Sequence, residues 1–156
     1  MGTTLAKNRG LHMRSKAVEH RTTHAFQEAL KTVTNAIGKA GMTVFAEIDH
    51  AKAARDNGLS MPETRVIVYG NPKAGTPVML HTPLTALDLP LRILVRELPG
   101  CSSAVAFHPM AEMFEELGVK RELAARFDAI QQAIIDEACG GCPTATREQK
   151  GTSSHS

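Results

Sequence analysis

The sequence predicts an α+β fold in which two long helices pack on one face of a mostly antiparallel sheet. Three observations lead to this class. Two long segments, 24–40 and 120–138, repeat apolar residues at spacings of three and four, the period of an amphipathic helix. Between them lie short runs that alternate or cluster apolar residues, as strands do. At 156 residues and 42% apolar, the chain holds one domain with a substantial core.

The strands are expected where such runs are bounded by turn residues. Residues 42–48 alternate strictly between two faces, which is the period of a strand. Residues 66–69 are all apolar or aromatic, a pattern typical of a strand buried on both sides. The expected strands are 16–22, 42–48, 64–69, 89–97 and 102–107.

The helices are expected to begin at capping residues and to end at glycines. Thr23 is the expected N-cap of the first long helix, and Asp49 that of a short helix after the second strand. Pro77 lies inside 73–81 and predicts a short, irregular helix there. The expected helices are 24–40, 50–57, 73–81, a region within 108–118, and 120–138. The order is thus strand, helix, four strands, helix, with small helical insertions.

The two ends differ in composition from the middle. Residues 1–13 and 139–156 are rich in Gly, Ser, Thr and charge, which predicts a disordered arm and tail around a domain at 14–138. Met13 is an alternative start to Met1. No secretory signal and no run of roughly 20 apolar residues is present. Three cysteines suit a reducing compartment. We therefore expect a cytoplasmic protein without a membrane partner.

The aromatic content argues against nucleic-acid binding. The chain has five Phe, one Tyr and no Trp, whereas base-stacking proteins need exposed aromatic side chains. Its formal net charge of +2 is nearly neutral. We expect no nucleic-acid partner.

Asp49, His50 and Asp88 are the candidates for acid–base chemistry. A carboxylate beside an imidazole can share proton transfer near neutral pH. Asp88 lies between two leucines, where a buried carboxylate without partners is costly. The alternative is structural: Asp49 caps a helix with His50 in its first turn, and Asp88 caps or turns the chain. Both interpretations remain open at this point.

The turn at residues 70–76 is a second candidate site. Gly70, Asn71 and Lys73 precede a helix, whose backbone amides could hold an anion with Lys73 as the opposite charge. It is not a phosphate-binding loop, because Lys73 stands between the glycines and not after the second one. A purely structural turn is the alternative.

Cys139 and Cys142 have the C-x-x-C spacing of thiol exchange or of half a zinc site. The pair follows a helix, whereas a redox pair of the thioredoxin type stands at a helix start, where the helix dipole lowers the thiol pKa. They are weak candidates, and we expect no resident metal and no cofactor.

Three blocks carry a family resemblance. Residues 41–50 (GMTVFAEIDH), 68–77 (VYGNPKAGTP) and 86–95 (ALDLPLRILV) occur in the order and at the separations typical of the DUF302 family, which the chain resembles over about 16–138. The resemblance implies a TATA-binding-protein-like β-α-β(4)-α fold and a homodimer. It implies no activity. Two positions depart from the pattern: Tyr69 replaces the usual Phe, and Arg96 replaces a common aromatic.

Three hypotheses for function follow. The first is a homodimeric domain that binds a small molecule or a partner protein without catalysis. Its site would combine the three polar turns, at Asp49, His50, Gly70, Asn71, Lys73, Asp88 and Pro90. The second is a small-molecule enzyme that uses Asp49, His50 and Asp88, and the third acts through Cys139 and Cys142. The first two depend on the turns converging in the folded chain.

Overall fold

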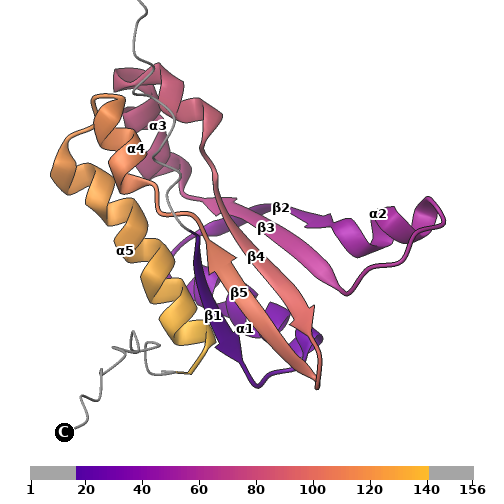
Figure 1. Ribbon diagram of the computed structural model, residues 1–156. Coiled ribbons are helices and arrows are strands. Elements are labelled where there is room, and N and C mark those ends of the chain that lie inside the picture. Colours follow the sequence, from indigo (N-terminus) through magenta and orange to yellow (C-terminus); the bar gives the residue numbers. More distant parts are fainter. Residues whose placement is uncertain (1–16, 141–156) are drawn as a thin grey trace, which may run out of the picture.

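The computed structural model describes residues 17–140, in which five strands form one sheet. The strand order is β1-β5-β4-β3-β2, and every neighbouring pair is antiparallel (Figure 1). The edge strands are therefore β1 and β2. The strands are β1 (Val18–Thr22), β2 (Thr43–Asp49), β3 (Thr64–Gly70), β4 (Leu91–Leu98) and β5 (Ser102–Phe107). The predicted α+β class and the order of its main elements are confirmed.

The helices occupy the expected segments, with small differences at their ends. Figure 1 shows α2 at one end of the sheet, and α3 and α4 gathered at the other. The described chain contains α1 (Phe26–Lys39), α2 (His50–Asp56), α3 (Pro72–His81), the 3-10 segment η1 (Pro83–Leu87), α4 (Ala111–Glu116) and α5 (Arg121–Ala138).

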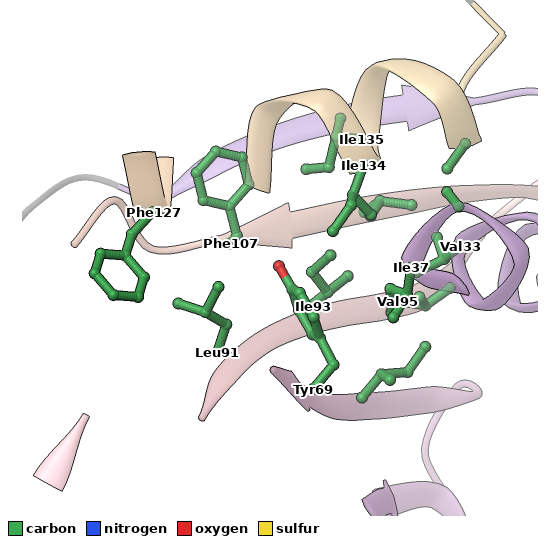
Figure 2. Packing of buried hydrophobic residues seen from close by; sticks show 14 of the residues in the cluster. Val33, Ile37, Tyr69, Leu91, Ile93, Val95, Phe107, Phe127, Ile134 and Ile135 are labelled. Carbon is green, nitrogen blue, oxygen red and sulfur yellow. The ribbon is translucent and has the colours of Figure 1, made fainter. Parts of the chain in front are cut away.

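One face of the sheet carries the core. Because side chains alternate along a strand, Ile93 and Val95 of β4 point to the same side, where both are fully buried. Figure 2 shows Val33 and Ile37 of α1 and Ile134 of α5 facing this side of the sheet. The two long helices also contact each other. Their single apolar stripes therefore meet on one face, as the sequence predicts.

The opposite face of the sheet is only partly covered. Val66 and Val68 of β3 are half-buried, whereas Ile67 and Tyr69 are fully buried. The prediction that this strand is buried on both sides was therefore wrong. Both long helices lie on the other face, so the apolar run of β3 has full cover on one side alone.

Two local predictions of element ends were also wrong. Helix α1 begins at Phe26 with Ala25 as N-cap, and not at His24 with Thr23 as N-cap. The Thr22 hydroxyl accepts the His24 N–H at 3.2 Å, so a side-chain contact to Thr22 takes this N–H before the helix begins. Strand β4 begins at Leu91 and not at residue 89, because Pro90 has no N–H to donate to the sheet.

Helix α5 positions α4 through buried polar contacts. The Asp128 carboxylate accepts the backbone N–H groups of Met110 at 2.6 Å and of Ala111 at 3.2 Å, so it takes the place of a capping residue for α4. Gln131 is buried and donates its amide to the His108 carbonyl at 3.1 Å. The short helix is thus held against the middle of α5.

Tyr69 brings a hydroxyl into the core without a partner. The residue is fully buried, and its hydroxyl has no hydrogen bond within residues 17–140. Figure 2 shows it pointing from β3 toward Phe107 and Ile134. Burial raises the pKa of the Tyr69 phenol well above its usual value. The core therefore contains one polar atom whose lost hydration no contact replaces.

Replacing Tyr69 by Phe should stabilise the protein. The variant removes an unsatisfied buried group, so we expect its free energy of unfolding to rise by about 1 kcal/mol. Urea denaturation at neutral pH measures the change. Tyr69→Leu, which also removes the ring, should destabilise instead.

The same variant has a pH signature. An unfolded tyrosine ionises near pH ~10, whereas the buried phenol stays neutral, so the wild type should lose stability above that pH. The Tyr69→Phe protein should lose less. A less stable Tyr69→Phe protein, or an unchanged alkaline loss, would contradict this description of the core.

Candidate ligand-binding cavity

A cavity of about 260 Å³ lies at one end of the sheet, between α3 and α5. Its walls come from four separate stretches of sequence: the start of β2, the turn from β3 into α3, the connection from η1 to β4, and the first half of α5. Typical ligand sites measure ~300–1,000 Å³, so this volume suits a small molecule. The lining residues are Met42, Phe45, Gly70, Asn71, Pro72, Ala74, Gly75, Thr76, Met79, Leu89, Pro90, Leu91, Leu123, Arg126, Phe127 and Ile130.

The turn from β3 into α3 depends on a close approach at Gly70. A Cβ atom there would lie 3.3 Å from the Phe45 ring and 3.4 Å from the Pro90 Cβ, so a side chain would press these two walls apart. Asn71 then caps α3, because its Oδ1 accepts the Lys73 N–H at 3.0 Å, and Pro72 follows in the first turn. The helix expected at 73–81 is confirmed, with Pro72 as its first residue.

The predicted anion site at this turn is not formed by the backbone. The amide of Lys73 donates to the Asn71 side chain, and those of Ala74 and Gly75 donate to the Asn71 carbonyl at 3.1 and 2.8 Å. These groups already have acceptors. The Lys73 side chain is exposed and does not line the cavity.

The third predicted turn reaches the cavity through Pro90 and not through Asp88. Leu89 and Pro90 line it, next to Gly70. Asp88 is half-buried and ends η1, with its N–H donating to the Thr85 carbonyl at 3.0 Å. Two of the three turns therefore meet, and their shared surface is mainly apolar.

Asp49 and His50 lie at the other end of β2. Thr43 pairs with Gly70, whereas Asp49 pairs with Arg65, so about 17 Å of strand separates Asp49 from the cavity turn. Asp49 caps α2 by accepting the Lys52 N–H at 2.8 Å, and His50 is the exposed first residue of that helix. The predicted cap is confirmed, and the acid–base group of Asp49, His50 and Asp88 is not assembled.

A backbone hydrogen bond and a nearby guanidinium stabilise the ionised form of the Asp49 carboxyl. The Lys52 backbone N–H first, and then the Arg65 guanidinium at 2.8 Å, hold the pKa of the Asp49 carboxyl below its usual value. Arg65 also approaches Glu47 at 3.4 Å and lies over the Phe26 ring, 5.8 Å from its centroid. The Asp49 carboxylate therefore has a structural role at the junction of β2 and α2.

The wall formed by α5 was not predicted as part of a site. Leu123, Phe127 and Ile130 stand on the apolar stripe of this helix and were expected in the core. The residue that was missed is Arg126, an exposed charged residue at the edge of that stripe. Arg96, where the family has an aromatic, lies outside the lining and forms a bidentate pair with Glu19, with its Nη2 at 2.9 Å.

The lining consists mainly of apolar groups. Of its side chains, those of Asn71, Thr76 and Arg126 are polar, and none is a carboxylate, an imidazole or a thiol. Asn71 already accepts a helix N–H. The surface can enclose an apolar body and offers one positive charge, but it contains no general base.

The thiol candidates fall at the edge of the described chain. Cys139 ends α5 as its C-cap, and Cys142 lies outside the described residues. Among residues 17–140, no three His, Cys, Asp or Glu side chains are grouped as metal ligands would be.

A second hollow of about 510 Å³ lies near the end of β1. It is lined by Arg21, Thr22, Thr23, His24, Leu98, Pro99, Ser102 and Cys139, a more polar set than that of the first cavity, and contains none of the turn residues predicted to bind a ligand. We therefore take the cavity between α3 and α5 as the candidate site. None of the described helices combines the length and hydrophobicity of a bilayer-spanning segment.

Comparison with protein families matches residues 18–137 to the model described as "Domain of unknown function DUF302". Among solved structures, the chain resembles the crystal structure of an uncharacterized conserved DUF302 protein from Bacillus stearothermophilus, with a TM-score of 0.71 and 15% identity. That alignment covers 79% of this chain and 97% of the other, and it supports the fold.

Curated relatives match a shorter stretch. The fluoride-specific ion channel FluC 1 of Brucella suis is 38% identical over 74 residues, 47% of this chain and 29% of that protein. The proteins named FluC 1 of Brucella abortus and FluC 2 of Brucella melitensis match equally over 27% of their length. The chain thus spans less than a third of these relatives.

The cap and ion pair of Asp49 predict a pH-dependent contribution to stability. Asparagine still caps a helix but has no charge for Arg65, so Asp49→Asn should lower the midpoint of thermal unfolding at neutral pH. A pKa lowered by folding adds stability above the ordinary value of 3.8, which is lost as the pH falls through the lowered pKa. Wild type and variant should therefore converge in acid. Scanning calorimetry from neutral pH into acid measures the unfolding midpoints of both proteins.

Asp56→Asn is the matched control, because Asp56 pairs with Lys52 on the exposed side of the same helix. It should have a smaller effect at neutral pH. Equal effects of both variants, or a difference that persists in acid, would contradict the assigned role of Asp49.

Proposed function

The chain belongs to the DUF302 family, and we propose that this member is a small homodimeric protein that binds one mainly apolar small molecule between α3 and α5 without converting it. The observation that carries the proposal is the cavity itself. All three family-like sequence blocks, at 41–50, 68–77 and 86–95, contribute residues to its walls. Its apolar walls and few polar groups have the character of ligand sites.

The chemistry of the lining supports binding without turnover. A hydrolytic or proton-transfer enzyme needs an acid, base or nucleophile within hydrogen-bond reach of the ligand, and the lining includes none. The carboxylates proposed for catalysis have other roles, Asp49 at the cap of α2 and Asp88 at the end of η1. We also propose a cytoplasmic setting, on the cysteine usage alone.

Strand β2 supports the homodimer. It is an edge strand, so one row of its backbone N–H and C=O groups has no partner strand within residues 17–140. Phe45 and Ile48 on this strand are 48% and 45% exposed. Two copies of one edge strand can pair about a two-fold axis, since each offers the same groups to the other. Phe45 also lines the cavity, which would bring the site close to that interface.

The Brucella relatives favour a second candidate, a domain that works with a membrane channel. They are named fluoride-specific ion channels, and a 74-residue part of each resembles this chain. We propose no channel activity for this chain, because the match covers less than a third of those proteins. Fluoride therefore belongs among the compounds tested for binding, with chloride as its control.

A variant that fills the cavity should abolish ligand binding without loss of folding. Gly75 lies in α3, and a Cβ there meets only Met79, at 3.9 Å, so Gly75→Phe places a ring in the free space. A compound present at 100 times its Kd stabilises the native state by about 2.7 kcal/mol, which raises the Tm by several degrees. Thermal shift over a panel of small metabolites should find compounds that stabilise the wild type and not Gly75→Phe.

Gly75→Ala is the matched control, since alanine favours the helix by about 1 kcal/mol and leaves the cavity nearly open. It should bind as the wild type does. A panel without any stabilising compound, or compounds that stabilise Gly75→Phe equally, would contradict the assignment of this cavity.

Self-association through β2 should depend on its exposed apolar side chains. We expect light scattering to give twice the 16.8 kDa chain mass for the wild type and a single chain mass for Ile48→Lys, because a charged side chain on an edge strand disfavours pairing with another edge. Leu87→Lys changes a leucine that is 81% exposed on η1 and should remain dimeric. A wild-type monomer, or a dimeric Ile48→Lys, would refute this interface.

A further inference from the structure

We infer that the ligand of this cavity is an amphipathic monocarboxylate, with an apolar body between α3 and α5 and its carboxylate on Arg126. This inference rests on the proposed binding function and adds the class of ligand. It starts from one observation: Arg126 is the single charged side chain in an otherwise mainly apolar lining.

Arg126 stands at the exposed edge of the apolar stripe of α5, beside residues that line the cavity. Leu123, Phe127 and Ile130 are its neighbours at helical spacings of three and four, and all line the cavity. Phe127 is buried and Leu123 is half-buried, whereas Arg126 is exposed. The charge is thus at the mouth, with apolar walls behind it.

The guanidinium of Arg126 forms no ion pair within residues 17–140. Glu122, one turn earlier on α5, has the right spacing but makes no such contact. By contrast, Arg55, Arg65 and Arg96 each pair with a carboxylate at 3.4 Å or less. Arg92 and Arg121 are also unpaired, but they do not line the cavity. Arg126 therefore combines an available charge with an apolar cavity.

This combination selects a particular chemistry. An arginine fork matches the two oxygens of a carboxylate, and the low polarity of the nearby walls strengthens the attraction. No acidic side chain lines the cavity to repel an anion. A neutral molecule with the same apolar body would contact the apolar walls but would not pair with the Arg126 guanidinium. A volume of about 260 Å³ leaves room for a short chain or a single ring and not for a large lipid.

The test compares straight-chain carboxylates with alcohols of equal length. Hexanoate, octanoate and decanoate, each below its micelle concentration, are titrated by calorimetry against 1-hexanol, 1-octanol and 1-decanol. The variants are Arg126→Gln, Arg121→Gln as the matched control on the same helix, and Gly75→Phe. The measured quantity is the ratio of alcohol Kd to carboxylate Kd for each protein.

We expect this ratio to fall about fivefold in Arg126→Gln, as for a partly exposed charged pair, with the alcohol Kd unchanged. Arg121→Gln should keep the wild-type ratio, and higher salt should lower it in the wild type. An unchanged ratio in Arg126→Gln overturns the inference. The inference is also overturned if no carboxylate binds while alcohols or other neutral compounds bind and lose their binding in Gly75→Phe. That result would leave the proposed binding function intact. If nothing binds in a manner sensitive to Gly75→Phe, both proposals fail.

Discussion

The position of α5 against the sheet is the constraint on which the cavity depends. The last half of this helix packs Ile134, Ile135 and Ala138 into the core. The first half extends to the end of the sheet where α3 begins, and its Leu123, Phe127 and Ile130 line the cavity. A helix long enough to cover the sheet and reach beyond it creates the space between them.

Polar contacts hold that helix in place along its length. The Asp128 carboxylate accepts a backbone N–H at the start of α4, and the Gln131 amide donates to the backbone carbonyl of His108 just before it. Asp128 is half-buried and Gln131 is buried. On the other side, Gly70 allows Phe45 and Pro90 to approach the turn closely. The site is therefore formed between elements whose positions are fixed by the core and by local capping, and not by a loop alone.

The fold could be predicted because its signals are local. The stripe of α1 and the cap at Asp49 each follow from a few neighbouring residues. The strict alternation predicted for 42–48 was wrong in its second half, because a register shift between Val44 and Ala46 places Ala46 and Ile48 on the other face of the sheet. The element ends that failed, at Thr23 and before Leu91, depend on contacts at the junction of two elements, such as the Thr22 hydroxyl that accepts the His24 N–H. Burial of Val66 and Val68 depends on which face of the sheet the helices pack against, and the packed face is set by tertiary contacts.

The site was harder to predict because it depends on strand register. Gly70, Asn71 and Pro90 meet because β3 ends where β4 begins. Asp49 lies far from them because β2 is antiparallel to β3, so the end of β2 pairs with the start of β3. Spacing in the sequence cannot distinguish these two outcomes. Arg126 gave a signal only as a charge at the edge of the apolar stripe of α5, and that stripe was interpreted only as core.

Amide chemical-shift mapping by NMR tests the central claim most directly. Titration of the wild-type chain with a compound that stabilises it should move the resonances of residues 70–76 and 123–130, which lie on the two walls of the cavity. The resonances of α2, at the other end of β2, should stay unchanged. Shifts concentrated at Asp49 and α2, with none on α3 or α5, would contradict the account.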